Sequence, residues 1–412
     1  MDDASTIPKF VVDLSLPPEI RYNHIIPHFQ DSVAACNLPS LFDELLETVV
    51  GPRYGKVLAT VARYTLRRVH SAEETAELTG ISQAIGIPMH ILVAFNVLLD
   101  LLLGCTSGGV RTLDPQSSKQ ATRMLHFRTL DWGMEQLRQI IVELDFVRFT
   151  GGPVIATTIT YLGYVGVLTG VRKGLSMSLN FRPHHAQETS WQEFSFRWNQ
   201  AMVVLGYRQS ISSTLRNILL DASPDPDQQP RKSQETNIIS SDSKVSDQYV
   251  QNVLTKLSTS NSTAAYLIFC QPNRTYIVEK DHRSANIRES DTFLTAYNHD
   301  VKDEEDPSRL QEAVATLADG EDVTGMADLV GLSLSRQHHL QGHWRKRVSA
   351  CRRRYKQRSD VVTMSDVIGF LEHDEIGNLE THYAVIMDPE EGKVLWRRQY
   401  EVESDSDSED SP

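Results

Sequence analysis

Apolar and polar positions divide the chain into segments, and the longest apolar run, residues 87–104, stands at the centre of the pattern. The run has the continuity of a helix, and it ends on Gly104 directly before Cys105. Its polar residues Asn96 and Asp100 lie one turn apart on a single face. The run is long enough to be considered as a membrane span, but polar groups confined to one side favour a helix buried within the protein.

The same pattern predicts further elements along the chain. Alternation predicts strands at residues 10–16, 122–130, 154–161, 174–181, 264–270, 275–279, 293–300, 380–388 and 393–397. Helical spacing predicts helices at residues 28–70, broken at Gly51 and Pro52, and at 188–205, 210–220 and 249–257. Helices, strands, helices and again strands predict an α+β protein with two β layers covered by helices.

Four stretches contain few apolar residues and are expected to lie outside the core. They are the polar loop 111–120, the insertion 221–248, the acidic segment 301–325 and the acidic tail 399–412, of which the insertion and the tail are expected to be disordered. The basic cluster at residues 344–358 is interpreted as a solvated loop or helix face, with an anionic membrane contact as the alternative.

Composition limits the kinds of binding partner and the cellular compartment that are expected for the chain. The formal charge of -13 argues against nucleic acid as the main partner of the 412-residue chain. Its cysteines form no CxxC pair, and the histidines at 184–185, 338–339 and 343 lack a completing set of ligands, so no metal and no cofactor is expected. The first ten residues contain no apolar stretch of the kind found in signal peptides, which predicts a cytoplasmic location.

The central cysteine begins a motif that continues about twenty residues downstream. Cys105-Thr106-Ser107 is followed by Arg128 and Asp131 within the segment His126–Gly133. An apolar helix, a cysteine that opens a strand and an Arg-Xaa-Xaa-Asp pair resemble the N-terminal-nucleophile hydrolases, in particular the acid ceramidase and N-acylethanolamine acid amidase family, which is similar to the choloylglycine hydrolases. Residues 14–22, 73–86 and 162–171 resemble other segments of that family.

The resemblance implies a four-layer αββα N-terminal-nucleophile hydrolase fold, made as an inactive precursor. Cleavage before the cysteine would divide the chain into a mostly helical segment, residues 1–104 (the α subunit), and a catalytic part, residues 105–398 (the β subunit). Members of the family are typically lysosomal. The resemblance therefore implies a lysosomal or vacuolar location if the true N-terminus is missing.

Cleavage would turn Cys105 into its own base. A free α-amine has a pKa near ~7.7–8.0, so a useful fraction is neutral near pH 7 and accepts the thiol proton. In this scheme Asp131 holds the amine and Arg128 favours the thiolate. Residues three apart lie on opposite faces of a regular strand, so the strand is expected to end or bulge near Thr129–Leu130, with Asp131 on the following turn as an alternative.

The resemblance implies two more catalytic residues. Asn298, within Tyr297-Asn298-His299-Asp300, matches the asparagine that donates to the oxyanion in the family. A later family arginine matches Arg336, with Arg345 as the alternative. Residue 181 is a phenylalanine where ceramidases carry a glutamate, a departure that concerns self-processing and substrate handling.

Together these residues predict a self-processing cysteine amidase that acts on a linear N-acyl amide lipid, such as a ceramide or an N-acylethanolamine. Its expected partners are this lipid substrate and a membrane surface. Strain at Gly104 is expected to assist cleavage, or to be lost because glycine has no side chain. Two alternatives stay open: an amidase of the same fold acting on other linear amides, and a non-catalytic lipid-binding or scaffold protein.

Overall fold

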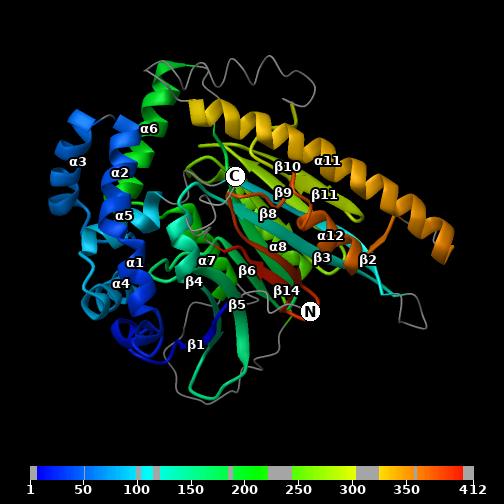
Figure 1. Ribbon diagram of the computed structural model, residues 1–412, viewed down its shortest axis with the longest axis horizontal. Coiled ribbons are helices and arrows are strands. Elements are labelled where there is room, and N and C mark those ends of the chain that lie inside the picture. Colours follow the sequence, from blue (N-terminus) through cyan, green and yellow to red (C-terminus); the bar gives the residue numbers. More distant parts are fainter. Residues whose placement is uncertain are drawn as a thin grey trace, which may run out of the picture.

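Two β-sheets stacked face to face form the centre of the molecule in the computed structural model (Figure 1). The structure describes residues 7–50, 52–98, 104–114, 121–183, 189–220, 244–302, 324–356 and 360–401. The larger sheet has eight strands in the order β1 (Lys9–Asp13), β4 (Ile141–Val147), β5 (Val154–Tyr161), β6 (Thr169–Arg172), β7 (Leu175–Phe181), β8 (Ala265–Cys270), β9 (Thr275–Lys280) and β10 (Ala285–Ser290). Only the β1–β4 pair in it is parallel.

The smaller, six-stranded sheet carries the central cysteine. Its order is β11 (Phe293–Ala296), β2 (Gly104–Leu113), β3 (Thr122–Asp131), β13 (Thr381–Asp388) and β14 (Lys393–Gln399), and the short β12 (Val362–Thr363) pairs in parallel with β2. Strands β2 and β3 pair in unbroken antiparallel register from Gly104 opposite Asp131 to Leu113 opposite Thr122. This regular ladder fixes the side on which each site residue lies.

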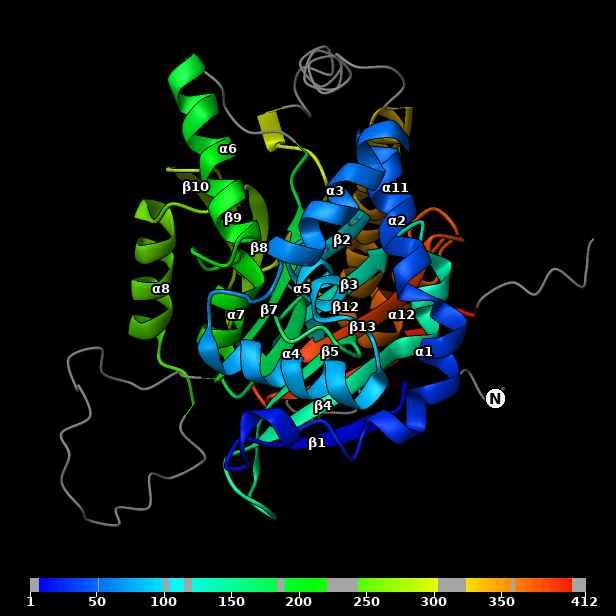
Figure 2. The same ribbon diagram turned by 90° about the vertical axis from the view of Figure 1, so that its left-hand side faces the viewer.

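Helices cover the outer face of each sheet. Helices α11 (Thr324–Tyr355) and α12 (Met364–Leu371) pack on the smaller sheet, while α7 (Ile211–Leu220) and α8 (Asp247–Thr259) pack on the larger one. Figure 2 shows α7 and α8 on one side of the sheets and α11 and α12 on the other. The order helix, sheet, sheet, helix is the predicted αββα architecture.

The N-terminal helices pack together beside the sheets, at the left in Figure 1. They are α1 (Gln30–Cys36), α2 (Leu38–Val50), α3 (Pro52–Thr65), α4 (Ala72–Ile85) and α5 (Met89–Leu98), with α6 (Ser190–Val204) against α5. The described residues also form three short 3-10 helices, η1 (Pro18–Ile20), η2 (Ile26–Phe29) and η4 (Glu135–Ile140). The predicted break before Pro52 is confirmed, and a second break occurs at Asn37, whose φ of 43° places it in the left-handed region.

Helix α5 is buried, as its one polar face predicts. The Asn96 amide donates to the carbonyl oxygens of Leu92 and Gly163 and accepts the N–H of Val165. The predicted helix 87–104 is nevertheless too long, because Gly104 is the first residue of β2 and residues 99–103 lie outside the described ranges. In the described part of the chain we find no helix with the length and apolarity that crossing a membrane requires.

A buried ion cluster ties α4 to α7 and to the N-terminal segment. The Glu77 carboxylate accepts from Arg216 at 2.6 and 2.7 Å and from Arg21 at 2.8 Å. Arg216 also donates to the carbonyl of Val165, which lies in the loop between β5 and β6. Removing one member would leave an uncompensated buried charge, which typically costs about 3–5 kcal/mol.

Several sequence predictions need correction at their ends. β2 continues through Leu113, so residues 111–113 are strand rather than loop, and β11 ends at Ala296 rather than at residue 300. Helix α8 begins at Asp247, so the polar insertion is shorter than 221–248; residues 221–243 lie outside the described ranges. Gln399 belongs to β14 and Tyr400 packs on the α11–α12 core, so the tail begins later than predicted.

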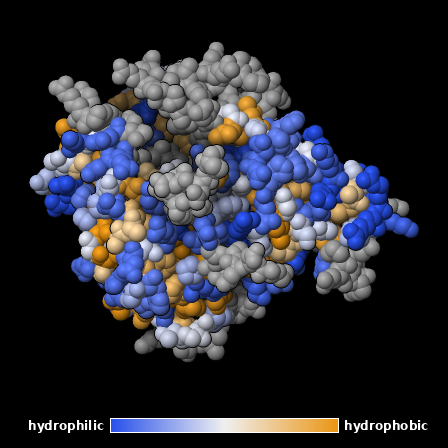
Figure 3. All heavy atoms as spheres, viewed as in Figure 1, coloured by the Kyte–Doolittle hydropathy of each residue, from blue (hydrophilic) through white to orange (hydrophobic). Residues whose placement is uncertain are grey.

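The basic cluster predicted at 344–358 lies largely within α11. Figure 3 shows that the end of this helix projecting from the body is mostly hydrophilic. Arg347 pairs with Asp366 and Arg352 with Asp360. These pairs place the cluster on a solvated helix face, which is one of the predicted interpretations.

Candidate active site

Cys105 and Arg128 meet on the face of the smaller sheet that packs against the larger one. Cys105 is the second residue of β2, and Arg128 lies on β3 two positions away from the residue directly opposite. Nη2 of Arg128 lies 3.1 Å from the Cys105 thiol. Both side chains are fully buried.

The larger sheet holds the guanidinium of Arg128 in place. Nη2 donates to the carbonyl oxygen of Leu179 at 2.7 Å, and Nη1 donates to Thr169 Oγ1 at 2.5 Å and to the carbonyl of Leu168. Burial raises the pKa of the Cys105 thiol, and the positive charge of Arg128 opposes that shift. In the uncleaved chain the thiol is therefore enclosed and only partly activated.

Asp131 lies on the opposite face of β3, toward α11. Its Oδ2 accepts from Nη1 of Arg336 at 3.1 Å, and its Oδ1 accepts from the hydroxyl of Thr381 at 2.8 Å. Burial raises the pKa of Asp131, while Arg336 and Thr381 act in the opposite direction.

Asn298 links the two faces. Its Oδ1 accepts the backbone N–H of Cys105 at 2.8 Å and Nη2 of Arg336 at 3.0 Å, and its amide nitrogen donates to the carbonyl of Phe181 at 2.8 Å. It follows the end of β11, and its backbone N–H donates to Ser333 on α11. The structure thus brings all five predicted residues into one hydrogen-bonded network, in which Arg336 connects Asp131 to the amide that holds the Cys105 nitrogen.

Of the two candidate arginines, only Arg336 reaches this network. Arg345, nine positions later on the same helix, is exposed and bonds the side chain of Gln341. Sequence spacing left this choice open because α11 was not predicted as a helix.

The predicted irregularity near Thr129–Leu130 is wrong. β3 runs regularly to Asp131, and the register shift lies in the neighbouring strand β13, between Thr381 and Tyr383. The alternation argument itself holds, since Arg128 and Asp131 do face opposite sides. Thr381, which the sequence analysis did not identify, is a direct partner of Asp131; its only signal was its place at the start of a predicted strand.

Gly104 adopts an ordinary strand conformation. It pairs with Asp131 and is not among the described glycines that have a positive φ. The expectation that conformational freedom at Gly104 strains the bond before Cys105 is therefore not supported by its φ angle.

Polar side chains continue the site between the two sheets. His126 lies within hydrogen-bond distance of Ser176 and Ser178, and Ser107 donates to Asn180 at 2.7 Å. Burial lowers the pKa of His126 to about 3, so this imidazole is neutral at physiological pH. Because both ring nitrogens have hydroxyl partners, the neutral ring remains satisfied in the interior.

Phe181 is the residue at which the sequence departs from the family pattern that it otherwise resembles. Its buried side chain belongs to the apolar core, and its carbonyl accepts from Asn298. The next residue, Arg182, pairs with Asp300 at 2.6 Å and Asp281 at 3.2 Å. The backbone at this position thus supports the site even though the side chain is apolar.

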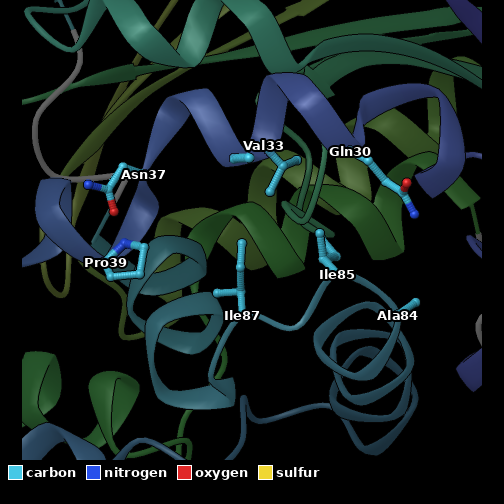
Figure 4. A pocket seen from close by; sticks show the side chains of 8 residues that line it. Gln30, Val33, Asn37, Pro39, Ala84, Ile85 and Ile87 are labelled. Atoms are coloured by element: carbon cyan, nitrogen blue, oxygen red, sulfur yellow. The ribbon is translucent and has the colours of Figure 1, made fainter.

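A surface pocket of about 390 Å³ lies among the N-terminal helices (Figure 4). It is lined by Gln30, Val33, Ala34, Asn37, Pro39, Ala84, Ile85 and Ile87, none of which belongs to either sheet. The pocket therefore contains none of the five site residues. Within the ranges given above, no group of three or more His, Cys, Asp or Glu side chains is arranged to hold a metal ion.

A cysteine at the head of an inner strand, packed between two sheets that helices enclose, is the arrangement of the N-terminal-nucleophile hydrolases, and the fold is of this class.

A family model described as the beta subunit of N-acylethanolamine-hydrolyzing acid amidase matches residues 5–70. Acid ceramidase of Mus musculus is 29% identical over 193 residues, which cover 43% of this chain and 46% of that protein. The N-acylethanolamine-hydrolyzing acid amidase of Caenorhabditis elegans is 32% identical over 184 residues, covering 42% and 47%. Over these segments the chain is similar to acid ceramidases and N-acylethanolamine-hydrolyzing acid amidases.

The alignments span about half the length of these curated relatives. The solved structure of the Caenorhabditis elegans N-acylethanolamine-hydrolyzing acid amidase ortholog aligns with a TM-score of 0.44 at 18% identity, covering 69% of this chain and 93% of that one.

Proposed function

We propose that this protein is a self-processing cysteine amidohydrolase that cleaves the amide bond of an N-acylated lipid and releases a fatty acid and an amine. One observation carries the proposal: a single network holds both the thiol and the backbone nitrogen of Cys105, through Arg128 and Asn298 respectively. The two atoms that N-terminal-nucleophile chemistry uses, the sulfur and the nitrogen of one residue, thus each have a polar side-chain partner.

Self-processing would begin with attack of the Cys105 thiolate on the carbonyl carbon of Gly104. The Gly104–Cys105 C–N bond breaks, the nitrogen takes a proton and becomes the free α-amine, and a thioester joins the Gly104 acyl group to Sγ. Water then hydrolyses the thioester and frees the thiol. Asn298 Oδ1, which accepts from this nitrogen in the intact chain, would hold the new amine in the same place.

Amide hydrolysis would use the same atoms on an external substrate. The amine of Cys105 takes the thiol proton, Arg128 stabilises the thiolate, and the thiolate attacks the acyl carbon. The Asn298 side-chain amide, which donates to the Phe181 carbonyl in the intact chain, is the group that we assign to the oxyanion. The protonated amine then donates to the departing amine of the substrate, and water releases the fatty acid.

The surroundings of the nucleophile support an apolar acyl chain. Arg128 is anchored on the carbonyl of Leu168, the last residue of a buried apolar segment. That segment, residues 161–168, packs under Phe95 of α5, whose ring contacts Tyr161 and Tyr164. The relatives named ceramidase and N-acylethanolamine amidase act on lipids of this kind, which supports the same substrate class here.

Contact with a membrane surface is part of the proposal. Helix α6 exposes Trp191, Phe194 and Trp198 to 69%, 55% and 51%, in a stacked row on one face. Helix α3 exposes Val61 and Tyr64 and lies at the same end of the molecule in both views (Figures 1 and 2). Exposed aromatic rows of this kind are suited to the interface between water and lipid.

A panel of acyl amides tests the proposed activity. Wild-type protein, incubated with a fluorescent ceramide, N-palmitoylethanolamine and a short-chain acyl amide, should release acid from the long-chain substrates. Cys105→Ala should be inactive, whereas Cys351→Ala, which removes another buried thiol, should keep the activity. Release only from the short-chain amide would redirect the substrate assignment, and no release from any substrate at any pH would refute the proposed activity.

The membrane contact has its own assay. Replacing Trp191, Phe194 and Trp198 together by serine should reduce cosedimentation with phospholipid vesicles and leave turnover of a water-soluble acyl amide unchanged. Equal cosedimentation of the variant and the wild type would remove α6 from the proposal.

A further inference from the structure

We propose that Thr381 is a positioning residue that orients Asp131 for both self-cleavage and amide hydrolysis. This inference rests on the proposed function. The two oxygens of the Asp131 carboxylate have donors from different elements, Thr381 on β13 and Arg336 on α11. Both donors and the carboxylate are buried, so no solvent competes for these bonds.

The hydroxyl of Thr381 can direct its proton only toward Asp131. Its oxygen accepts the backbone N–H of Asn378 at 3.0 Å while it donates to Asp131 Oδ1 at 2.8 Å. Since a hydroxyl has one proton, the bond from Asn378 leaves Asp131 as its acceptor.

The bulge in β13 makes this contact geometrically available. Arg128 and Asp131, three apart on a regular strand, need support from opposite sides of the sheet. Residues 381 and 383 would share one side in a regular strand, but the register shift between them turns Thr381 toward α11 and Tyr383 toward the larger sheet. Tyr383 lies 2.8 Å from Thr169, which in turn accepts from Arg128. One extra residue thus lets a single strand support both charged groups.

The extra residue, His382, is itself locked on the side of the larger sheet. Its Nε2 donates to the carbonyl of Trp132 at 2.9 Å, and its Nδ1 accepts the hydroxyl of Tyr161 at 2.7 Å. Trp132 directly follows Asp131, so His382 also fixes the end of β3. The bulge is therefore held from both sides and keeps Thr381 in register with Asp131.

From Thr381 the contacts lead to the nucleophile in three steps. Asp131 orients Arg336, Arg336 donates to Asn298, and Asn298 accepts the N–H of Cys105. The other charged and titratable groups that act on Asp131 are Arg128, Glu380, Cys105 and Tyr400. The hydrogen bond from Thr381, a neutral group, favours the ionised form of Asp131.

The pH profile of turnover and self-cleavage tests the role. Thr381→Val keeps the shape and removes the donor, Thr381→Cys leaves a weak donor, and Thr381→Ser restores the hydroxyl. Loss of a hydrogen bond to a charged group should raise the pKa of Asp131 and move the acid limb of the profile upward by roughly one to two pH units in the valine variant. We expect a smaller shift for cysteine and little for serine. The matched control is Thr160→Val on β5, which removes a buried hydroxyl that has no hydrogen-bond partner among the described residues.

Urea unfolding across pH 4–8 gives a second measurement that needs no activity. Thr381→Val should lose more stability at neutral pH than at low pH, because the missing bond matters only while Asp131 is ionised. The role of Thr381 would be overturned if Thr381→Val showed an unmoved acid limb and a loss of stability that does not depend on pH. If Thr381→Val does not fold, the same criteria apply to Thr381→Cys. A Thr381→Ser variant that is as impaired as Thr381→Val would also overturn the role. Wild-type protein without cleavage or turnover would instead refute the proposed function, and the unfolding data would still decide the role of Thr381 toward Asp131.

Discussion

Arg128 reaches diagonally across the β2–β3 ladder to place Nη2 3.1 Å from the thiol of Cys105. The residue opposite Cys105 is Leu130, and the residue opposite Arg128 is Ser107. A diagonal contact between neighbouring strands requires a long side chain that is held at its far end, and the carbonyls of Leu168 and Leu179 provide that support. Contacts from both sheets therefore fix the position of the Arg128 guanidinium beside the Cys105 sulfur.

Replacing Arg128 by lysine should lower turnover by about 10–100-fold. An ammonium keeps the charge but cannot donate in a fork to the thiol, Thr169 and two carbonyls at once, and a hydrogen bond to a charged group is worth about 1.5–3 kcal/mol. Steady-state kinetics would measure the loss. Arg123→Lys, on the same strand but partly exposed and paired with Asp388 away from the Cys105 thiol, should behave as wild type. Equal rates for both lysine variants would show that the guanidinium is not used.

Replacing Asn298 by alanine should lower turnover by about 10²–10³-fold, because the oxyanion loses its donor and the Cys105 nitrogen loses its acceptor. The ratio of single-turnover rates for wild type and variant would measure this, with far-UV circular dichroism to confirm folding. Asn252→Ala, on the exposed face of α8, is the control. An Asn298 variant that keeps the wild-type rate would remove this residue from the site.

The two candidate arginines should differ sharply. Arg336→Ala leaves the buried Asp131 without its charged partner, which should cost about 3–5 kcal/mol in the free energy of unfolding and abolish self-cleavage. Arg345→Ala, on the same helix but exposed, should change stability by less than about 0.5 kcal/mol. Urea titrations of both variants would measure the difference. A reversed order would assign the role to Arg345.

Much of the site was predictable because its residues belong to short motifs. Cys105, Arg128 and Asp131 lie within 27 positions on adjacent strands, and their opposite faces followed from strand alternation. Asn298 and Arg336 came from a resemblance, and the choice of Arg336 over Arg345 required α11. This helix of 32 residues went unrecognised because many of its residues are polar or basic and it lacks a clear apolar stripe. The bulge in β13 left no local signal, since it arises from pairing with β3 rather than from residues 381–383 themselves.

The strands between residues 140 and 172 show a second limit. β4 (Ile141–Val147) is buried along its whole length and carries Glu143 and Asp145 at alternate positions, a pattern that was not recognised as a strand, and the four-residue β6 was concealed within an apolar segment. The edge strand β10, with its mostly polar sequence, was also missed. Alternation identified β7, whose Ser176, Ser178 and Asn180 bond polar side chains of the smaller sheet while its Leu and Met side chains join the apolar core.

Acid should destabilise the fold through two buried histidines. The pKa values of His126 and His382 fall to about 3, whereas an unfolded histidine titrates near 6.5. The unfolded chain therefore binds two protons that the folded chain does not, and stability is lost as pH falls from about 6.5 toward 3. Each histidine contributes about 1.4 kcal/mol per pH unit to this slope.

This slope can be measured in the Cys105→Ala background, where the chain stays intact. Between pH 7.5 and pH 5, the free energy of unfolding of His126→Asn should fall by about 2 kcal/mol less than that of its parent, as measured by urea unfolding. His24→Asn, at an exposed position, controls for the loss of an imidazole. Identical slopes for His126→Asn and its parent would mean that His126 is protonated in the folded protein.

The state of the Gly104–Cys105 bond tests the central claim most directly. Intact-mass measurement and N-terminal sequencing of purified protein, before and after mild acidification, would show whether the chain consists of residues 1–104 and a fragment that begins with Cys105. We expect these two fragments in the wild type and one uncut chain in Cys105→Ala, with amide hydrolysis appearing at the same rate as the fragments. A wild-type protein that hydrolyses acyl amides while the Gly104–Cys105 bond remains intact would contradict the N-terminal-nucleophile mechanism.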